Sequence, residues 1–184
     1  MCRCDHRHMT DDGRRDLARM RASARVWPEL RCEPGPDAGF PEDVNFERRA
    51  EVLRALQHDR RPGDLELVRW LLAQEVAQCR RSWGLAEETQ LAGYLLAEYR
   101  QVEDVWLQWD LKSANFDTQC GYDGLYLVAA GVTATIEFVR ASEHADRDAV
   151  LAYLHNADGV PEWSEPELAA WFAARREWFP ATPG

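Results

Sequence analysis

Apolar residues recur with helical spacing along most of the chain after position 45. Leu65, Val68, Leu72, Val76 and Cys79 are three or four residues apart, so they line one face of a helix over four turns. Prolines, glycines and helix-capping side chains repeatedly interrupt this spacing. The pattern therefore predicts a series of helices joined by short turns.

Seven helices account for the periodic segments. Because the connections are short, neighbouring helices are expected to run antiparallel, in a compact bundle or a short α-solenoid. The expected fold class is all-α, with a single helical domain over residues 45–184. The segments are bounded by Asn45 and Pro62, Asp64 and Gly84, Ala86 and Tyr99, Val102 and Ser113, Leu125 and Val139, Asp146 and Asn156, and Ser164 and Pro180.

The segment from Leu125 to Val139 is apolar on almost every side. A helix of this kind belongs in the middle of a bundle, so we expect it to be the buried central helix. Its β-branched and aromatic residues also suit a strand, but the run is long and no second strand candidate exists to pair with it. Glu137 falls inside the segment, and a buried acid must be paired or have a raised pKa. Arg140, three residues on, is the expected partner.

The stretch from Leu91 to Ser113 resembles one helical hairpin of the tetratricopeptide family. Tyr94 and Tyr99 precede a short turn, and Val105 and Trp109 follow it. The similarity lacks the small-residue positions of that family and does not recur at its period of about 34 residues. It implies packed helix pairs and no repeat array.

Residues 1–44 are expected to form a partly disordered arm and linker. Residues 28–43 contain four prolines and two glycines, which disfavour helix and strand, and a short helix is compatible with 14–25. The first residues alternate side chains of the types that bind zinc or copper, but their spacing lacks the folded loop of a structural site. A translation start placed too far upstream, with non-native sequence ahead of Met9 or Met20, or simple disorder is favoured over a metal site, and no cofactor is expected. The alternating residues are Cys2, Cys4, His6 and His8.

The charge of the chain is concentrated in its second half. The formal net charge is −10, and residues 87–184 alone carry six basic and seventeen acidic side chains, which is −11. Such a surface repels nucleic acid and anionic lipid, and it favours a basic protein partner or simply keeps the protein soluble. No apolar run is long enough to span a membrane, and no address signal is recognised, so a cytoplasmic protein of bacterial type with free thiols is expected.

A polar segment from Asp110 to Asp123 separates two apolar helices and holds the only lysine of the chain. In the structural interpretation, Asn115 and Asp117 cap the next helix, and Lys112 pairs with Asp110 or Asp117. In the functional interpretation, tryptophans and convergent polar groups form a small-ligand site. A nucleophilic Cys120 would further need His144 or His155 close by. The candidate ligand-binding residues are Trp106, Trp109, Lys112, Asn115, Asp117, Cys120 and Asp123.

These observations favour a binding protein over an enzyme, because no catalytic or metal signature is present. The leading hypothesis is a protein-interaction module, such as an inhibitor or immunity-type binder of a basic partner, with an acidic face in its second half. The alternative is an enzyme or ligand-binding protein with a pocket at Trp106–Asp123. An exposed apolar and acidic surface would favour the first hypothesis, and a cavity at Lys112 or Asp117 the second. The oligomeric state is not readable from the sequence.

Overall fold

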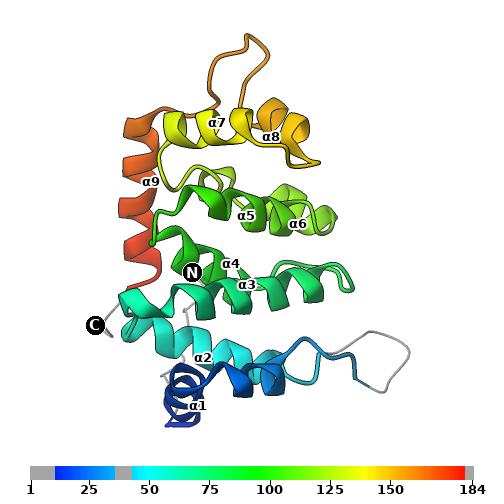
Figure 1. Ribbon diagram of the computed structural model, residues 1–184, viewed down its shortest axis with the longest axis vertical. Helices are drawn as coiled ribbons and strands as arrows, with labels where there is room; N and C mark the ends of the chain where they lie inside the picture. Colours follow the sequence, from blue (N-terminus) through cyan, green and yellow to red (C-terminus); the bar gives the residue numbers. More distant parts are fainter. Residues whose placement is uncertain (1–10, 36–42, 181–184) are drawn as a thin grey trace, which may run out of the picture.

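The computed structural model describes residues 11–35 and 43–180, and these residues form an all-α domain with bundle-like packing (Figure 1). Apart from two isolated β-bridges, they contain no strand pairing. The 3-10 helices are η1 (Ala24–Leu30), η2 (Pro62–Asp64), η3 (Val102–Asp104) and η4 (Gly124–Tyr126). The α-helices are α1 (Asp11–Ala22), α2 (Phe46–His58), α3 (Leu65–Cys79), α4 (Glu87–Ala97), α5 (Val105–Lys112), α6 (Phe116–Gly121), α7 (Val132–Ala141), α8 (Arg147–Tyr153) and α9 (Glu165–Trp178).

The helices are stacked in tiers along the long axis of the molecule. Figure 1 shows α1 and α2 at one end, α3 and α4 next, then α5 and α6, and finally α7 and α8. Helix α9 runs along one side of the stack and brings the end of the chain back to α2. There the Gln57 side chain donates a hydrogen bond to the carbonyl of Pro180 at 2.9 Å.

The all-α class predicted from the apolar spacing is confirmed. Ser164 begins the last predicted segment, and a capping box is present there, since its hydroxyl accepts from the Glu167 amide and the Glu167 carboxylate accepts from the Ser164 amide. Two helices add to the predicted seven. Helix α1 lies in the predicted arm, and α6 lies in the predicted polar turn.

The prediction of one continuous central helix over residues 125–139 is wrong. Residues 124–126 form η4, and α7 begins only at Val132, after Gly131 takes a φ of +121°. Glycine adopts this backbone conformation readily, and other residues do not. The non-helical residues Leu127 and Val128 are buried, whereas α7 exposes one face, on which Glu137 lies. The buried acid expected at Glu137 is therefore also wrong.

Residues 11–35 belong to the helical body. Helix α1 packs against α2, and Leu17, Met20 and Leu30 are buried in the common core. Part of the predicted arm therefore supplies core residues, which the arginine-rich sequence of α1 conceals. The rest of that prediction, including Cys2, Cys4, His6 and His8, falls outside the described residues.

A buried ion cluster joins the first two tiers. The Arg49 guanidinium forms an ion pair with Asp43 and a second one with Glu75 at 2.9 Å, and all three side chains are almost completely buried. Thr89 of α4 donates to the other Glu75 oxygen at 2.9 Å, and Arg49 also donates to the carbonyl of Leu30. Burial raises the pKa of the Glu75 carboxyl, and the Arg49 charge counteracts the increase. The cluster around Arg49 thus links η1, the residues just before α2, α3 and α4.

A second group of polar contacts attaches α9 to the stack. Glu98, at the end of α4, accepts from Arg60 at 3.1 Å and from Arg176 at 3.0 Å. Next to it the Arg100 guanidinium lies 3.7 Å from the centre of the Phe172 ring. These contacts connect α4 and the end of α2 with α9.

We expect Asp43→Ala to lower the free energy of unfolding by about 1–3 kcal/mol, because the buried Arg49 guanidinium keeps Glu75 but loses one of its two carboxylate acceptors. Urea denaturation followed by circular dichroism measures the change. Asp158→Ala is the control: Asp158 is exposed and its carboxylate pairs with no basic group in the described part of the chain, so its removal should cost less than about 0.5 kcal/mol. Equal effects of the two substitutions would contradict the role of the cluster.

Candidate functional site

The polar segment from Asp110 to Asp123 covers the end of α5, all of α6 and the turn that leads to η4. It lies in the third tier, with α6 at one edge of the molecule (Figure 1). Its polar side chains form hydrogen bonds with different parts of the fold.

Asn115 and Asp117 fasten α6 to the α3–α4 connection. Asn115 caps α6 by accepting from the Thr118 amide at 2.8 Å, and its amide group donates to the carbonyls of Cys79 at 2.8 Å and Ser82 at 3.0 Å. The Asp117 carboxylate accepts from the amide of Gly84 at 2.5 Å. The predicted capping by Asn115 is confirmed, while Asp117 binds a neighbouring loop instead.

Lys112 is buried and forms no ion pair with a carboxylate of the described residues. Its ammonium donates to the carbonyl of Tyr122 at 2.5 Å and lies 5.4 Å from the centre of the Tyr153 ring. Burial lowers the pKa of Lys112. The predicted ion pair is wrong, because Asp110 pairs with Arg80 and Asp117 binds Gly84.

Asp123 and Tyr122 connect the segment with the core. The Asp123 carboxylate accepts from the Leu125 amide at 3.0 Å, from the Trp171 indole at 2.5 Å and from Arg175 at 3.3 Å. The Tyr122 hydroxyl donates to Gln108 beneath the backbone of Gly93. A Cβ on Gly93 would lie 1.8 Å from that hydroxyl, so glycine permits the close approach.

The two tryptophans of the predicted site face the next tier. Trp106 stacks on the His144 ring, with centres 4.0 Å apart and planes 11° apart, and Trp109 lies 5.6 Å from the Tyr153 ring. His155 hydrogen-bonds the carbonyl of Leu151 at 2.7 Å. Neither histidine is hydrogen-bonded to Cys120, whose side chain is exposed.

The structure therefore engages the polar groups of Lys112, Asn115, Asp117 and Asp123 within the fold itself. This arrangement supports the structural interpretation of the segment. A ligand-binding role for the seven predicted residues stays a prediction.

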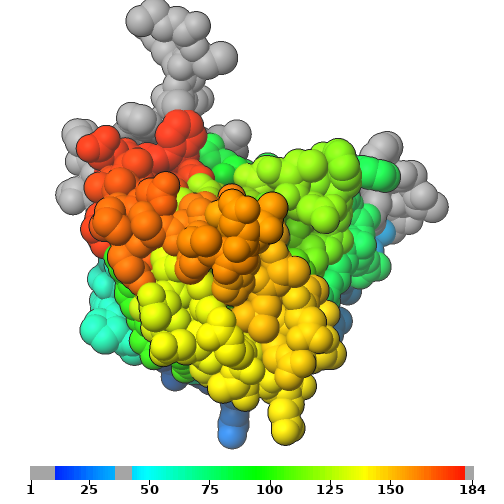
Figure 2. All heavy atoms as spheres, turned by 90° about the horizontal axis from the view of Figure 1, so that it is seen from above, coloured from blue at the N-terminus to red at the C-terminus, as the bar shows by residue number. Residues whose placement is uncertain are grey.

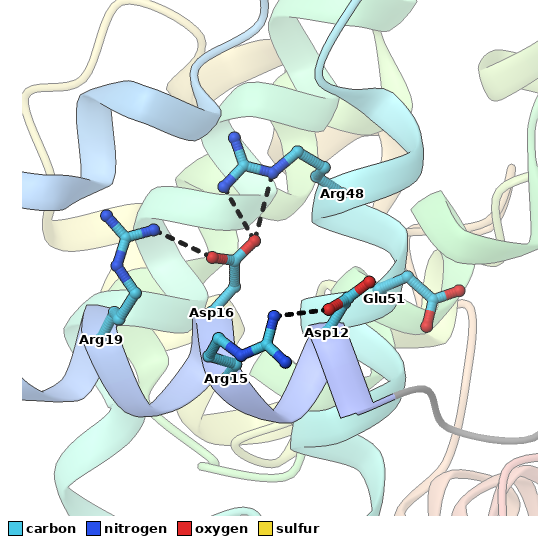
Figure 3. A pocket seen from close by; sticks show the side chains of 6 residues that line it. All are labelled: Asp12, Arg15, Asp16, Arg19, Arg48 and Glu51. Atoms are coloured by element: carbon cyan, nitrogen blue, oxygen red, sulfur yellow. Dashed lines mark hydrogen bonds and ion pairs between the residues drawn. The ribbon is translucent and has the colours of Figure 1, made fainter.

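An open hollow lies at the other end of the molecule, between α1 and α2 (Figure 3). Three arginines and three acids line it, so their charges balance. Arg15 pairs with Asp12 at 2.7 Å, and Arg48 and Arg19 both pair with Asp16, at 2.9 and 3.1 Å. The lining groups are occupied by one another, and Glu51, the sixth lining residue, pairs with Arg54.

Two exposed aromatic residues were missed by the sequence reasoning. Trp83 is 77% exposed and Phe116 is 66% exposed. The bonds from Asn115 to Ser82 and from Asp117 to Gly84 hold their backbones side by side. The polar, glycine-containing context of Trp83 was the available signal, but their proximity arises only from tertiary structure.

The α7–α8 end of the molecule is strongly acidic. Residues 132–167 carry eight acids and two arginines. Figure 2 shows that α7, α8 and the segment leading to α9 form this face. Seven exposed acids there form no ion pair within residues 11–35 and 43–180: Glu137, Glu143, Asp146, Asp158, Glu162, Glu165 and Glu167.

Within the described part of the chain, histidines, cysteines and acids nowhere form a group of three that could bind a metal ion. None of its helices has the length and apolar character to cross a membrane. Comparison with protein-family models, curated proteins and solved structures gives no match to this chain.

We expect the three cysteines in the described ranges to differ sharply in reactivity. Burial raises the pKa of Cys32 to about 11 and that of Cys79 to about 12, so both remain protonated thiols at neutral pH. Cys120 is exposed. Iodoacetamide at about pH 8 should alkylate Cys120 first, and the other two only after unfolding, as measured by peptide mass spectrometry. Faster alkylation of Cys79 in the folded protein would contradict the structure.

We expect Lys112→Met to lower the free energy of unfolding by about 1–3 kcal/mol at neutral pH, because it leaves the Tyr122 carbonyl without its donor. The folded-state pKa of Lys112 lies below the ordinary value of 10.5. At pH values between the lowered folded-state pKa and the ordinary pKa, the unfolded chain binds more protons than the folded chain. The stability of wild type relative to Lys112→Met therefore rises with pH in this range. Urea denaturation of both proteins from neutral pH to about pH 10 measures this difference, and a constant or shrinking difference would contradict it.

Proposed function

We propose that the protein is an interaction module that binds a basic protein through its acidic α7–α8 end, as an inhibitor or immunity-type binder would. The observation that carries the proposal is the group of exposed acids on this end without basic partners. Opposite charges on two proteins accelerate their association and orient the encounter.

The distribution of ion pairs supports this assignment of the surface. Residues 11–35 and 43–86 contain fourteen arginines and twelve acids, many of them paired with one another or with acids of α4 and η3. Residues 132–167 have a net charge of −6, and their one internal ion pair joins Arg147 to Asp148. A negative surface of this kind favours a cationic partner and disfavours nucleic acid.

The surface needs no pocket for this function. Protein interfaces are formed by complementary faces, whereas a small-molecule site needs a concave, mostly apolar cavity. At the Trp106–Asp123 segment the polar groups serve the fold, as described above. The geometry therefore supports binding of a protein better than it supports binding of a small ligand.

Neutralising the acidic face should slow association with a basic partner. We would capture binding proteins from native lysate, purify the most abundant one, and measure its association rate with wild type and with Glu143→Gln/Asp146→Asn/Glu162→Gln. We expect a partner with a basic isoelectric point, and an association rate about tenfold lower for the triple variant at low salt. The difference should diminish as salt is added.

A control triple variant changes the net charge by the same amount at other sites. Asp11→Asn, Glu47→Gln and Glu87→Gln replace exposed acids that form no ion pair within the described ranges. This variant should associate at nearly the wild-type rate. Equal slowing by both variants would show that only net charge matters, and a captured partner that is acidic would refute the proposal.

A further inference from the structure

Trp83 and Phe116 are exposed on neighbouring backbone segments at the edge of the second and third tiers, and we call these two residues the aromatic patch. They are the two most exposed large apolar side chains of the described residues. Trp83 belongs to the α3–α4 connection and Phe116 begins α6. Figure 1 shows the α3–α4 connection and α6 on its right side. Exposed aromatic side chains placed together commonly mark an association surface.

The backbone beneath the patch is fixed by hydrogen bonds and packing. Asn115 and Asp117, which flank Phe116, bind Ser82 and Gly84, which flank Trp83. At the other end of α6, a Cβ on Gly121 would lie 3.2 Å from the Leu85 side chain, so these two segments are in close contact. Because the backbone is fixed and an aromatic side chain has only two χ angles, covering the two residues costs little conformational entropy.

The charges around the patch are nearly balanced, in contrast to the rest of the second half of the chain. The rim carries two arginines and three acids. Arg80 pairs with Asp110 across the two segments, and Arg81 is exposed and pairs with no carboxylate of residues 11–35 and 43–180. The other two acids of the rim are Asp117 and Glu87.

We propose that this patch binds a second copy of the chain across a two-fold axis. A two-fold interface brings the same surface of each copy together, so apolar groups meet apolar groups and both signs of charge are available on each side. The unpaired Arg81 of one copy then finds acids on the rim of the other. Two copies that each carry a charge of −10 can approach closely only where the local charge is balanced.

The proposed occupant of the aromatic patch, a second copy of the chain, differs from the proposed partner of the acidic face. A basic protein gains little from a nearly neutral patch, and its electrostatic attraction is directed to the α7–α8 end. The second-copy proposal is therefore independent of the proposed function and is tested separately.

The test is the oligomeric state of the full chain and its dependence on the patch. Sedimentation and light scattering from about 1 µM to about 1 mM would give the dimer dissociation constant. We expect wild type to dimerise in this range, and Trp83→Ala and Phe116→Ala each to weaken the dimer at least about tenfold. Circular dichroism and urea denaturation confirm that each variant is folded.

Trp178→Ala is the matched control, because Trp178 is 59% exposed but lies at the end of α9. It should leave the dimer unchanged. Cys120, exposed near the end of α6, supplies an independent readout. With Cys2 and Cys4 replaced by serine, a short bis-maleimide should link two copies through Cys120, and Phe116→Ala should reduce the yield.

Three results would overturn the proposal. The first is a wild type that stays monomeric over the whole concentration range. The second is a dimer that Trp83→Ala and Phe116→Ala leave unchanged while Trp178→Ala weakens it. The third is a monomer that binds a different protein through Trp83, which would assign the patch to another occupant.

Discussion

The burial of the Arg49 guanidinium is the constraint on which the lower half of the stack depends. A buried cation is tolerated only when acids and acceptors surround it, and here Asp43, Glu75 and the Leu30 carbonyl do so. These groups come from the residues just before α2, from α3 and from the end of η1. Thr89 extends the network to α4. Removing Arg49 would leave Asp43 and Glu75 as buried acids without a cation, so this one side chain fixes the segments relative to one another.

The third tier is fixed by polar groups that resemble a binding site in the sequence. Asn115 gives its side-chain oxygen to the α6 amide and its side-chain nitrogen to the α3–α4 connection. Lys112 supplies the donor for a buried carbonyl. Both side chains satisfy backbone groups that the turns leave without helical partners. The unusual composition of the segment thus follows from backbone groups that need hydrogen-bond partners. The same hydrogen bonds hold the backbones of Trp83 and Phe116 side by side.

Charge divides the molecule into regions with different prospects for association. Arginines and acids neutralise each other in the first two tiers, whereas the α7–α8 end keeps acids without partners. Between them lies an edge with exposed aromatic residues and nearly balanced charge. The acidic end and the aromatic edge are therefore separate parts of the surface. The acidic end suits the proposed cationic partner, and the aromatic edge suits the proposed second copy of the chain.

The sequence by itself determined the all-α class and most helix positions, because helical spacing and capping are local signals. It failed at residues 125–131, where a uniformly apolar run conceals the break at Gly131, and at α1, whose few core residues lie among arginines. At the candidate site it located the capping Asn115 but gave Lys112 the wrong partner. Only the tertiary structure decided that partner, and only it placed Trp83 beside Phe116, because hydrogen bonds between residues more than thirty positions apart leave no periodic trace in a single sequence.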